Sequence, residues 1–285
     1  MKKLSKIILT AALTLGTLVS GLTVATQTSQ AKSKAQTITV GIMSGTKDDD
    51  EFWNVVKKNA KDRYNLNVKY KHFTDYNTPN RALQSGDLDA NAFQNTAFLN
   101  AWNKSHHTNI VSVGKTMLAP MKVYSKKYHS LKHLPNKATI SIPNDTANEG
   151  RSLQILKNAG LITFKKGANQ AKLTPNDIQK NSKHLQFKEV GAEQVAHNIT
   201  SVDAGVVNTN YAKSAGLTTK EAIYTELINK DSEKYASVIA TTKKKQNNQA
   251  VKNFVKAYQS KNVKQELKKI YGNTKIAAWD LNFNK

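Results

Sequence analysis

Residues 142–151 read IPNDTANEGR, and they join an expected strand, Thr139–Ile142, to an expected helix, Asn148–Ala159. Gly160 follows that helix, and glycine commonly ends one. At the start of a helix, outward-pointing backbone N–H groups favour an anion. Strand, turn and helix in this order indicate an α/β domain.

The alternation of strand and helix continues towards the N-terminus. Ile38, Val40 and Ile42 have the two-residue period of a strand, and residues 52–60 have helical spacing. The acidic run 48–51 at the start of that helix is interpreted as a cap that opposes the helix dipole, rather than as a cation site.

The pattern restarts after Pro120 and continues to the C-terminus. Further strands are expected near residues 122–125, 185–190, 204–207 and 236–240, and two amphipathic helices near 247–259 and 263–271. This doubled α/β pattern predicts two lobes with a cleft between them, a common place for a small ligand.

The charge of +23 comes from 43 basic and 20 acidic residues, and only three of the basic residues are arginines: Arg63, Arg81 and Arg151. Lysine is a hydrated point charge, whereas arginine grips carboxylates and phosphates with a planar fork. Lysines spread along the whole chain favour a solvated basic surface over a nucleic-acid site. Anionic cell-envelope polymers are therefore candidate partners, and nucleic acid is not.

Arg151 falls in the first turn of the expected helix, and two interpretations of it stay open. In one, its fork clamps a ligand carboxylate, which a lysine cannot do with the same geometry. In the other, it is a surface residue paired with Glu149 or Asp145.

Two further segments place aromatic and polar residues at strand ends, where α/β domains hold ligands. Tyr76 and Phe93 are candidate apolar walls, with core packing as the alternative for Phe93. Asn208 can accept a hydrogen bond from an ammonium group. For Asn210, a role as a helix cap is an equally good interpretation as a role at the ligand.

The sequence lacks the patterns of catalysis. No G-x-S-x-G, H-E-x-x-H, Walker or G-x-G-x-x-G motif occurs, and the absence of cysteine excludes thiolate chemistry. His129 and His133 have the spacing of a zinc pair, but Leu134-Pro135 follows, and a basic loop is the better interpretation. We therefore predict no enzyme, no catalytic residue, no cofactor and no metal.

An export signal is expected over residues 1–31, followed by a linker over 32–36. Three lysines precede an uncharged run, 7–25, and Ser29 and Ala31 fit a signal-peptidase site. The alternative is an uncleaved membrane anchor. Cleavage removes three lysines and no acid, which leaves a charge of +20.

A lipid anchor is not expected. Val19-Ser20-Gly21 resembles the tripeptide that precedes a lipidated cysteine, but Leu22 stands where the cysteine would be. The expected location is outside the cytoplasm, at the cell surface through charge alone.

Several segments together resemble the NlpA/MetQ family, the methionine-type solute-binding proteins of ABC importers. They are FTDYNTPNRAL (73–83), SGDLDANAFQN (85–95), SVGKTMLAPMKVYSKKYHSL (112–131), IPNDTANEGRSLQILKNAGLI (142–162) and VVNTNYAKSAGL (206–217). The similarity runs from about Ile38 to Trp279, and IPND-x-x-NEGR is its most specific part.

The resemblance implies an α/β, two-lobe fold of the periplasmic-binding-protein type II, with two crossover strands and the ligand in the interlobe cleft. Lobe I is expected over residues 37–117 plus 241–285, and lobe II over 118–240.

The resemblance also implies roles for individual residues. Arg151 would hold the ligand carboxylate, Asn148 and Asn208 would contact its polar end, and Tyr76 and Phe93 would line its side chain.

Two positions depart from the family pattern, which usually has a tyrosine before the Phe of the D-A-N segment and a histidine two residues after it. Ala92 and Asn95 stand there in this chain. Asn95 is still expected at the ligand, but the ligand is then methionine or a related amino acid or short peptide of different shape or polarity.

The expected function is that of a transport receptor. Its lobes close on a small amino-acid ligand, which it delivers to the permease and ATPase of an ABC importer. The alternative is a basic cell-surface adhesion protein that reuses the same fold.

Overall fold

The computed structural model describes residues 35–283. The expected export signal, residues 1–31, and the first part of the expected linker lie outside the described residues. Between residues 35 and 283, no helix is both long enough and apolar enough to cross a membrane.

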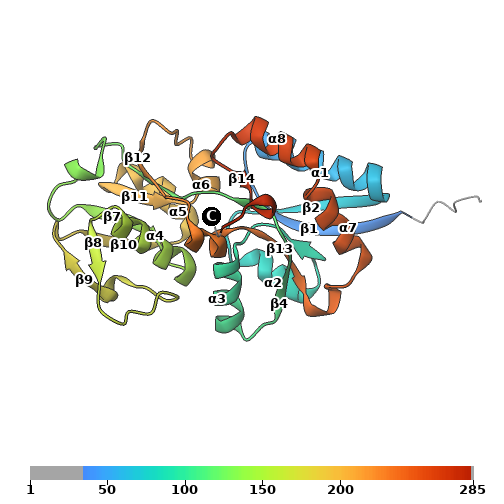
Figure 1. The fold of residues 1–285 in the computed structure, drawn as a ribbon, viewed down its shortest axis with the longest axis horizontal. Coiled ribbons are helices and arrows are strands. Elements are labelled where there is room, and N and C mark those ends of the chain that lie inside the picture. Colours follow the sequence, from blue (N-terminus) through green and yellow to red (C-terminus); the bar gives the residue numbers. More distant parts are fainter. Residues whose placement is uncertain (1–34, 284–285) are drawn as a thin grey trace, which may run out of the picture. The chain divides into compact units, whose positions relative to one another are not determined.

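The first of two large sheets has the strand order β2-β1-β3-β13-β4 (Figure 1). Its strands are β1 (Gln36–Met43), β2 (Leu66–Phe73), β3 (Ala90–Asn91), β4 (Ile110–Lys115) and β13 (Val238–Thr242). β1 is parallel to β2 and β3, whereas β13 is antiparallel to β3 and β4.

The second large sheet has the order β10-β7-β11-β6-β12. Its strands are β6 (Lys122–Tyr124), β7 (Thr139–Pro143), β10 (Gln186–Val190), β11 (Ala204–Val207) and β12 (Ala222–Thr225). β7 is parallel to β10 and β11, and β6 is antiparallel to β11 and β12. Two short pairs complete the strands: β5 (Met117–Leu118) with β14 (Ile276–Ala277), and β8 (Ile162–Phe164) with β9 (Ile178–Asn181).

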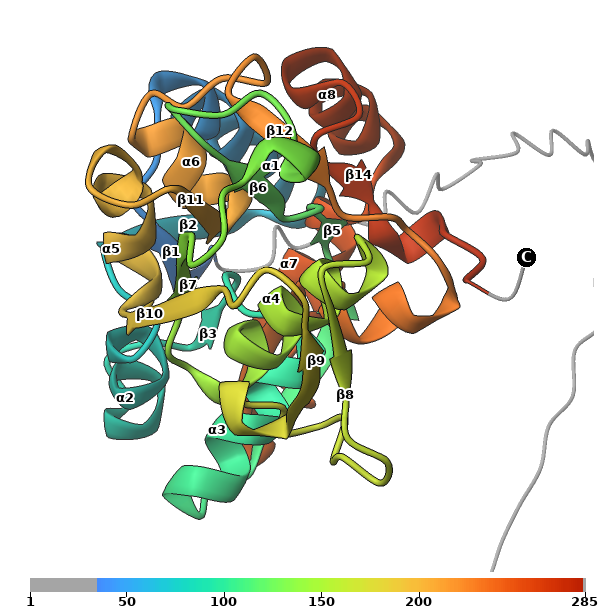
Figure 2. The ribbon, with the colours of Figure 1, turned by 90° about the vertical axis from the view of Figure 1, so that its left-hand side faces the viewer.

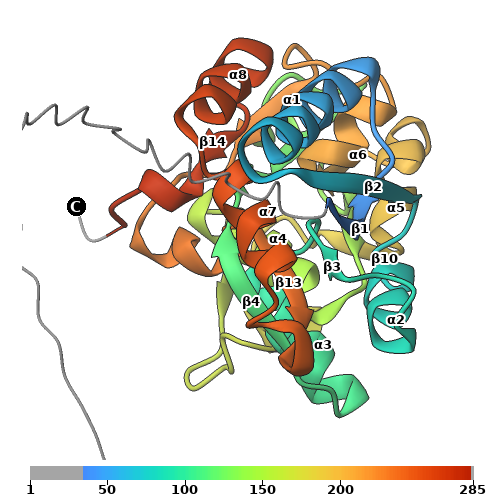
Figure 3. The same cartoon turned by 90° about the vertical axis from the view of Figure 1, so that its right-hand side faces the viewer.

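Helices cover both faces of each large sheet. They are α1 (Lys47–Tyr64), α2 (Thr78–Ser85), α3 (Thr96–His106), α4 (Thr146–Asn158), α5 (Ala192–His197), α6 (Thr209–Ser214), α7 (Gln249–Tyr258) and α8 (Lys261–Tyr271). In the first sheet, α7 packs on β1, β2 and β4, beside α1 (Figure 3). In the second, α4 packs on β7, and α5 packs on β7 and β11 (Figure 2).

The alternation of apolar side chains along β1 explains why this strand lies inside its sheet, between β2 and β3. Ile38, Val40 and Ile42 are fully buried in the cluster that α1, α7 and α8 share. On the opposite face a Cβ at Gly41 would lie 2.6 Å from a Leu88 side-chain carbon, so the chain needs glycine there. Both faces of β1 are therefore closely packed.

The predicted α/β alternation is confirmed. The acidic run 48–51 lies at the start of α1 and caps it, as interpreted. Asp49 forms a capping box with Thr46, the residue directly before the helix. Among residues 35–283, no group of three or more His, Cys, Asp or Glu side chains that could hold a metal ion is present. The lobe boundaries at 117/118 and 240/241 stay a prediction.

Candidate functional site

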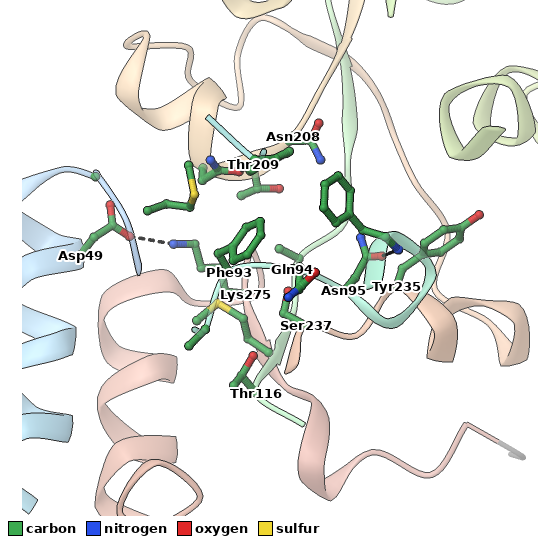
Figure 4. A pocket seen from close by; sticks show the side chains of 18 of the residues that line it. Asp49, Phe93, Gln94, Asn95, Thr116, Asn208, Thr209, Tyr235, Ser237 and Lys275 are labelled. Carbon is green, nitrogen blue, oxygen red and sulfur yellow. Dashed lines mark hydrogen bonds and ion pairs between the residues drawn. The ribbon is translucent and has the colours of Figure 1, made fainter. Parts of the chain in front are cut away.

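All six predicted site residues line one cavity of about 110 Å³. Phe93, Asn95 and Asn208 are labelled among its lining side chains in Figure 4. The six residues come from four places: the loop after β2 (Tyr76), the segment between β3 and α3 (Phe93 and Asn95), the N-terminal half of α4 (Asn148 and Arg151) and the end of β11 (Asn208). Segments far apart in the sequence thus meet at the ends of strands, where α/β proteins place ligands.

The guanidinium of Arg151 is buried and held by a partner that neither sequence interpretation named. Nε donates to Glu226 Oε1 at 2.8 Å, and Nη2 donates to Glu226 Oε2 at 2.5 Å. Nη2 also donates to the Ala119 carbonyl at 3.1 Å. The proposed pairing with Glu149 or Asp145 on the surface is therefore wrong, because the side chain of Arg151 is only 4% exposed and its fork clasps Glu226.

An aromatic ring packs against the same guanidinium. The central carbon of Arg151 lies 4.4 Å from the centre of the Tyr235 ring. Both residues line the cavity, and burial raises the pKa of Tyr235 to about 12, so the ring stays neutral at physiological pH. Arg151 is therefore held along one edge and packed against a ring.

A chain of hydrogen bonds orients the amides of Asn148 and Asn208. Asn148 Nδ2 donates to both carboxylate oxygens of Asp145, at 3.0 and 2.9 Å, so its Oδ1 points the other way. That oxygen accepts from Asn208 Nδ2 at 3.2 Å. Asn208 itself lines the cavity, and its Oδ1 is left buried and without a partner among the described residues.

The carboxylate of Asp145 sets the direction of this chain. It also caps α4, since Oδ1 accepts from the Asn148 backbone N–H at 2.9 Å. Burial raises the pKa of Asp145, although the bonds from Asn148 act against that rise. Asp145 accepts from Asn148, and Asn148 accepts from Asn208, so the free end of the chain, Asn208 Oδ1, is an acceptor as well.

Aromatic rings form one wall of the cavity. Tyr76 lies 5.9 Å from Phe93 and 5.8 Å from Phe98, measured between ring centres. The Tyr76 hydroxyl donates to Asn210 Oδ1 at 2.7 Å. The interpretation of Asn210 as a helix cap is therefore wrong, because the N-cap of α6 is Asn208, and Asn210 instead lines the cavity with Nδ2 buried and unpartnered.

The two positions that depart from the family pattern differ in what they do. Ala92 is buried, 8% exposed, and its small side chain leaves room in the cavity. Asn95 is the N-cap of α3, and its Oδ1 accepts from the Phe98 backbone N–H at 2.8 Å. Asn95 therefore begins a helix as well as lining the cavity.

A buried ion pair in the cavity wall was not predicted. Lys275 donates to Asp49 Oδ1 at 2.7 Å, and the Tyr271 hydroxyl donates to the same oxygen at 2.6 Å (Figure 4). Burial alone would raise the pKa of Asp49, but Lys275 and the hydrogen bonds hold it well below its usual value. Burial lowers the pKa of Lys275 in turn. No local pattern could reveal this pair, because 226 residues separate its members.

Comparison with proteins of known sequence gives consistent matches. The family model "NlpA lipoprotein" matches residues 38–279. The probable D-methionine-binding lipoprotein MetQ of Pasteurella multocida is 37% identical over 246 residues, which are 86% of this chain and 87% of that protein. The D-methionine-binding lipoprotein MetQ of Escherichia coli (strain K12) is 37% identical over 247 residues, 85% of this chain and 88% of that protein.

Solved structures agree. A nutrient-binding protein from Burkholderia cenocepacia bound to methionine has a TM-score of 0.80 at 44% identity, covering 84% of this chain and 99% of that one. The substrate-binding protein of a methionine transporter from Streptococcus pneumoniae has a TM-score of 0.80 at 29% identity, covering 85% and 96%. The fold is thus the two-lobe α/β fold of periplasmic binding proteins, and with a family model that spans nearly all of the described residues, the chain belongs to the NlpA lipoprotein family.

Proposed function

We propose that this chain is the extracytoplasmic substrate-binding protein of an ABC importer and captures methionine, or a closely related free amino acid, by lobe closure. One observation carries the proposal: Arg151 and Asn208 line a single cavity, and Asn208 Oδ1 has no hydrogen-bond partner among the described residues. A free amino acid offers a carboxylate to the first and an ammonium to the second.

The size of the cavity favours one amino acid over a short peptide. A water-sized group needs about 10–15 Å³, and the cavity measures about 110 Å³. It therefore has room for several water-sized groups, which supports a small ligand such as one amino acid.

The wall composition supports a thioether side chain. Met43 and Met117 line the cavity together with the rings of Tyr76 and Phe93. Sulfur and aromatic surfaces attract one another and adapt to an unbranched side chain. The relatives named for methionine binding support the same ligand.

Three contacts support a closed arrangement of the lobes, which we place at residues 37–117 plus 241–285 and 118–240. Besides the Tyr76–Asn210 bond, the Tyr211 hydroxyl donates to the Thr74 carbonyl at 3.1 Å. Lys213 forms an ion pair with Asp48 at 2.8 Å. Each contact joins the two proposed lobes, so each is available only when they meet.

The proposal places the protein outside the cytoplasm, with the permease and ATPase of the importer as partners and with no catalytic role. The names of the relatives, which are binding lipoproteins, support this. A cysteine-linked lipid is not an option for this sequence, which has no cysteine, so the charge of +20 expected after cleavage is the proposed means of retention. The same charge is what favours surface adhesion as a second candidate function.

Isothermal titration calorimetry tests the proposed function. The protein, stripped of co-purified ligand by mild denaturation and refolded, is titrated with methionine, other amino acids, a methionyl dipeptide and N-acetylmethionine. We expect methionine or a close relative to bind best, and N-acetylmethionine to bind about ten- to a hundred-fold more weakly, because it lacks the ammonium group.

Asn208→Ala should abolish the preference for a free amine, whereas Asn144→Ala, at an exposed asparagine before α4, should not. Equal binding of methionine and N-acetylmethionine by the unaltered protein would contradict the assignment of Asn208. Failure of every free amino acid to bind would refute the proposed function itself.

A further inference from the structure

We propose that Glu226 is a positioning residue for recognition of the ligand carboxylate, and that it acts through Arg151. The inference rests on the proposed function, because it concerns how that cavity binds a free amino acid. Neither the sequence patterns nor the family resemblance assigned Glu226 any part in the site.

Glu226 determines which part of the guanidinium is available. Its two oxygens take Nε and Nη2, and the Ala119 carbonyl takes Nη2 as well. None of the hydrogen bonds of Arg151 to the described residues uses Nη1. A ligand carboxylate in the cavity therefore meets the Nη1 side of a cation whose other edge is already occupied.

Glu226 is itself rigidly held, which a positioning residue must be. Its Oε2 accepts from the Met121 backbone N–H at 2.9 Å, and its own N–H donates to the Met121 carbonyl at 2.9 Å. It directly follows β12, whose last residue, Thr225, pairs with Lys122 of β6. The second sheet thus fixes the backbone of Glu226, its carboxylate fixes Arg151, and the ring of Tyr235 packs against the guanidinium.

The arrangement also excludes a simpler role for Glu226 as a surface counter-ion. Its side chain is 10% exposed and that of Arg151 is 4% exposed. The next residues, Leu227 and Ile228, are 63% and 46% exposed. The chain thus turns from a buried carboxylate to solvent within one residue, so Leu227 is a matched control beside it.

The test compares methionine with methioninamide, in which a neutral amide replaces the carboxylate. Glu226→Asp keeps the negative charge but shortens the side chain by one methylene, so the carboxylate no longer reaches Nε and Nη2. We expect the affinity for methionine to fall about tenfold or more, while the affinity for methioninamide changes little. Leu227→Ala should leave both affinities unchanged.

The Arg151→Lys variant lacks the guanidinium. It therefore distinguishes an effect of Glu226 on methionine binding that passes through Arg151 from an effect by another route. In Arg151→Lys, the further change Glu226→Asp should have little additional effect on methionine binding. Equal losses for methionine and methioninamide, or the same loss in both backgrounds, would show that Glu226 only maintains structure. If the unaltered protein binds methionine and the Glu226→Asp variant binds it equally well, the inference is overturned while the proposed function stays intact.

A measurement on the unaltered protein covers the case in which Glu226→Asp does not fold. Because the chain has only three arginines, the Nε–H signal of Arg151 can be assigned by NMR with Arg151→Lys as reference. We expect this proton to stay protected from exchange with saturating methionine, since Glu226 keeps it. Loss of protection on binding would mean that the ligand displaces Glu226, and the inference would be wrong.

Discussion

At residue 151, an arginine and a lysine differ although both carry one positive charge. The guanidinium of Arg151 meets two oxygens of Glu226, a carbonyl and an aromatic face at once. A single ammonium offers three donors from one point and cannot reproduce that planar geometry. The identity of this residue therefore matters beyond its charge.

Arg151→Lys should weaken methionine binding by about ten- to a hundred-fold, the result of losing charge-assisted hydrogen bonds worth about 1.5–3 kcal/mol. Calorimetry on the two proteins checks this. Lys157→Arg, the converse change near the end of α4, serves as the control. Unchanged affinity in Arg151→Lys would remove this residue from the site.

Single residues also show how much of the candidate site could be predicted from the sequence alone. Position 151 and the turn before it were predictable, because they belong to one local strand-to-helix pattern. The partner Glu226 was not, because it lies 75 residues away and local patterns carry no information on tertiary pairing. Asn210 was misread for a related reason, since its partner Tyr76 lies 134 residues away.

At the scale of helices, α4 concentrates the polar chemistry of the site in its first two turns. Asp145 caps it, Asn148 and Arg151 face the cavity, and Glu149 lies between them, buried at 7% exposure. Burial, together with the nearby carboxylates of Glu189 and Asp145, raises the pKa of Glu149 to about 7. The helix thus includes one group that titrates near neutral pH.

Glu149→Gln should stabilise the protein, and more so as the pH rises. A carboxyl whose pKa is raised in the folded state favours folding while it is protonated, and this contribution is lost as the pH rises through about 7. The amide removes that loss, so we expect a Tm higher by a few degrees at pH 8 and no clear difference near pH 4. Thermal melts across this pH range check the prediction, with the exposed Glu51→Gln as control. Equal behaviour of the two variants would contradict the raised pKa of Glu149.

The start of α3 bears on the two departures from the family pattern. Ala92→Tyr should shift preference towards methionine, because a ring would add apolar surface to the cavity wall. Asn95→His should instead cost about 1 kcal/mol of stability, because it removes the N-cap. A thermal-shift panel of amino acids and peptides on both single variants and on the double variant separates the two effects.

Strong methionine stabilisation of the unaltered protein, and no change in rank order in Ala92→Tyr, would show that position 92 does not set specificity. The cap role of Asn95 was not evident from the family comparison, since the resemblance directs attention to the ligand. The helix boundary itself gave the signal: an asparagine followed by Thr96 at the start of a helical run is a common N-cap pattern.

At the scale of the molecule, most strands of the two sheets and their helices were predictable because hydrophobic periods of two and about 3.6 residues are local properties, but β12 was not predicted. The cavity was predictable only as a place between strand ends. Its wall at Asp49 and Lys275 was not, since Lys275 is one of many lysines and nothing nearby in the sequence distinguishes it. Burial, which only the folded chain reveals, sets this lysine and Lys122 apart from the other described lysines.

The basic surface leads to a prediction for whole cells. The protein should be released from cells by washing with concentrated salt, because screening shortens to about 3 Å at roughly 1 M salt and cleavage after residue 31 would leave a charge of +20. Immunoblots of salt and detergent washes check this. Release by detergent alone would show that the apolar run over residues 7–25 remains as an anchor.

The unpartnered amide atoms in the cavity have a consequence for energy use by the importer. With the lobes together, Asn208 Oδ1 and Asn210 Nδ2 are both buried without a hydrogen-bond partner among the described residues. Each such atom costs about 1–3 kcal/mol, and an amino acid that reaches them offsets the cost. Under the proposed function, cargo therefore makes the closed form of the receptor more favourable, and an importer that responds to the closed form would hydrolyse less ATP on empty receptors.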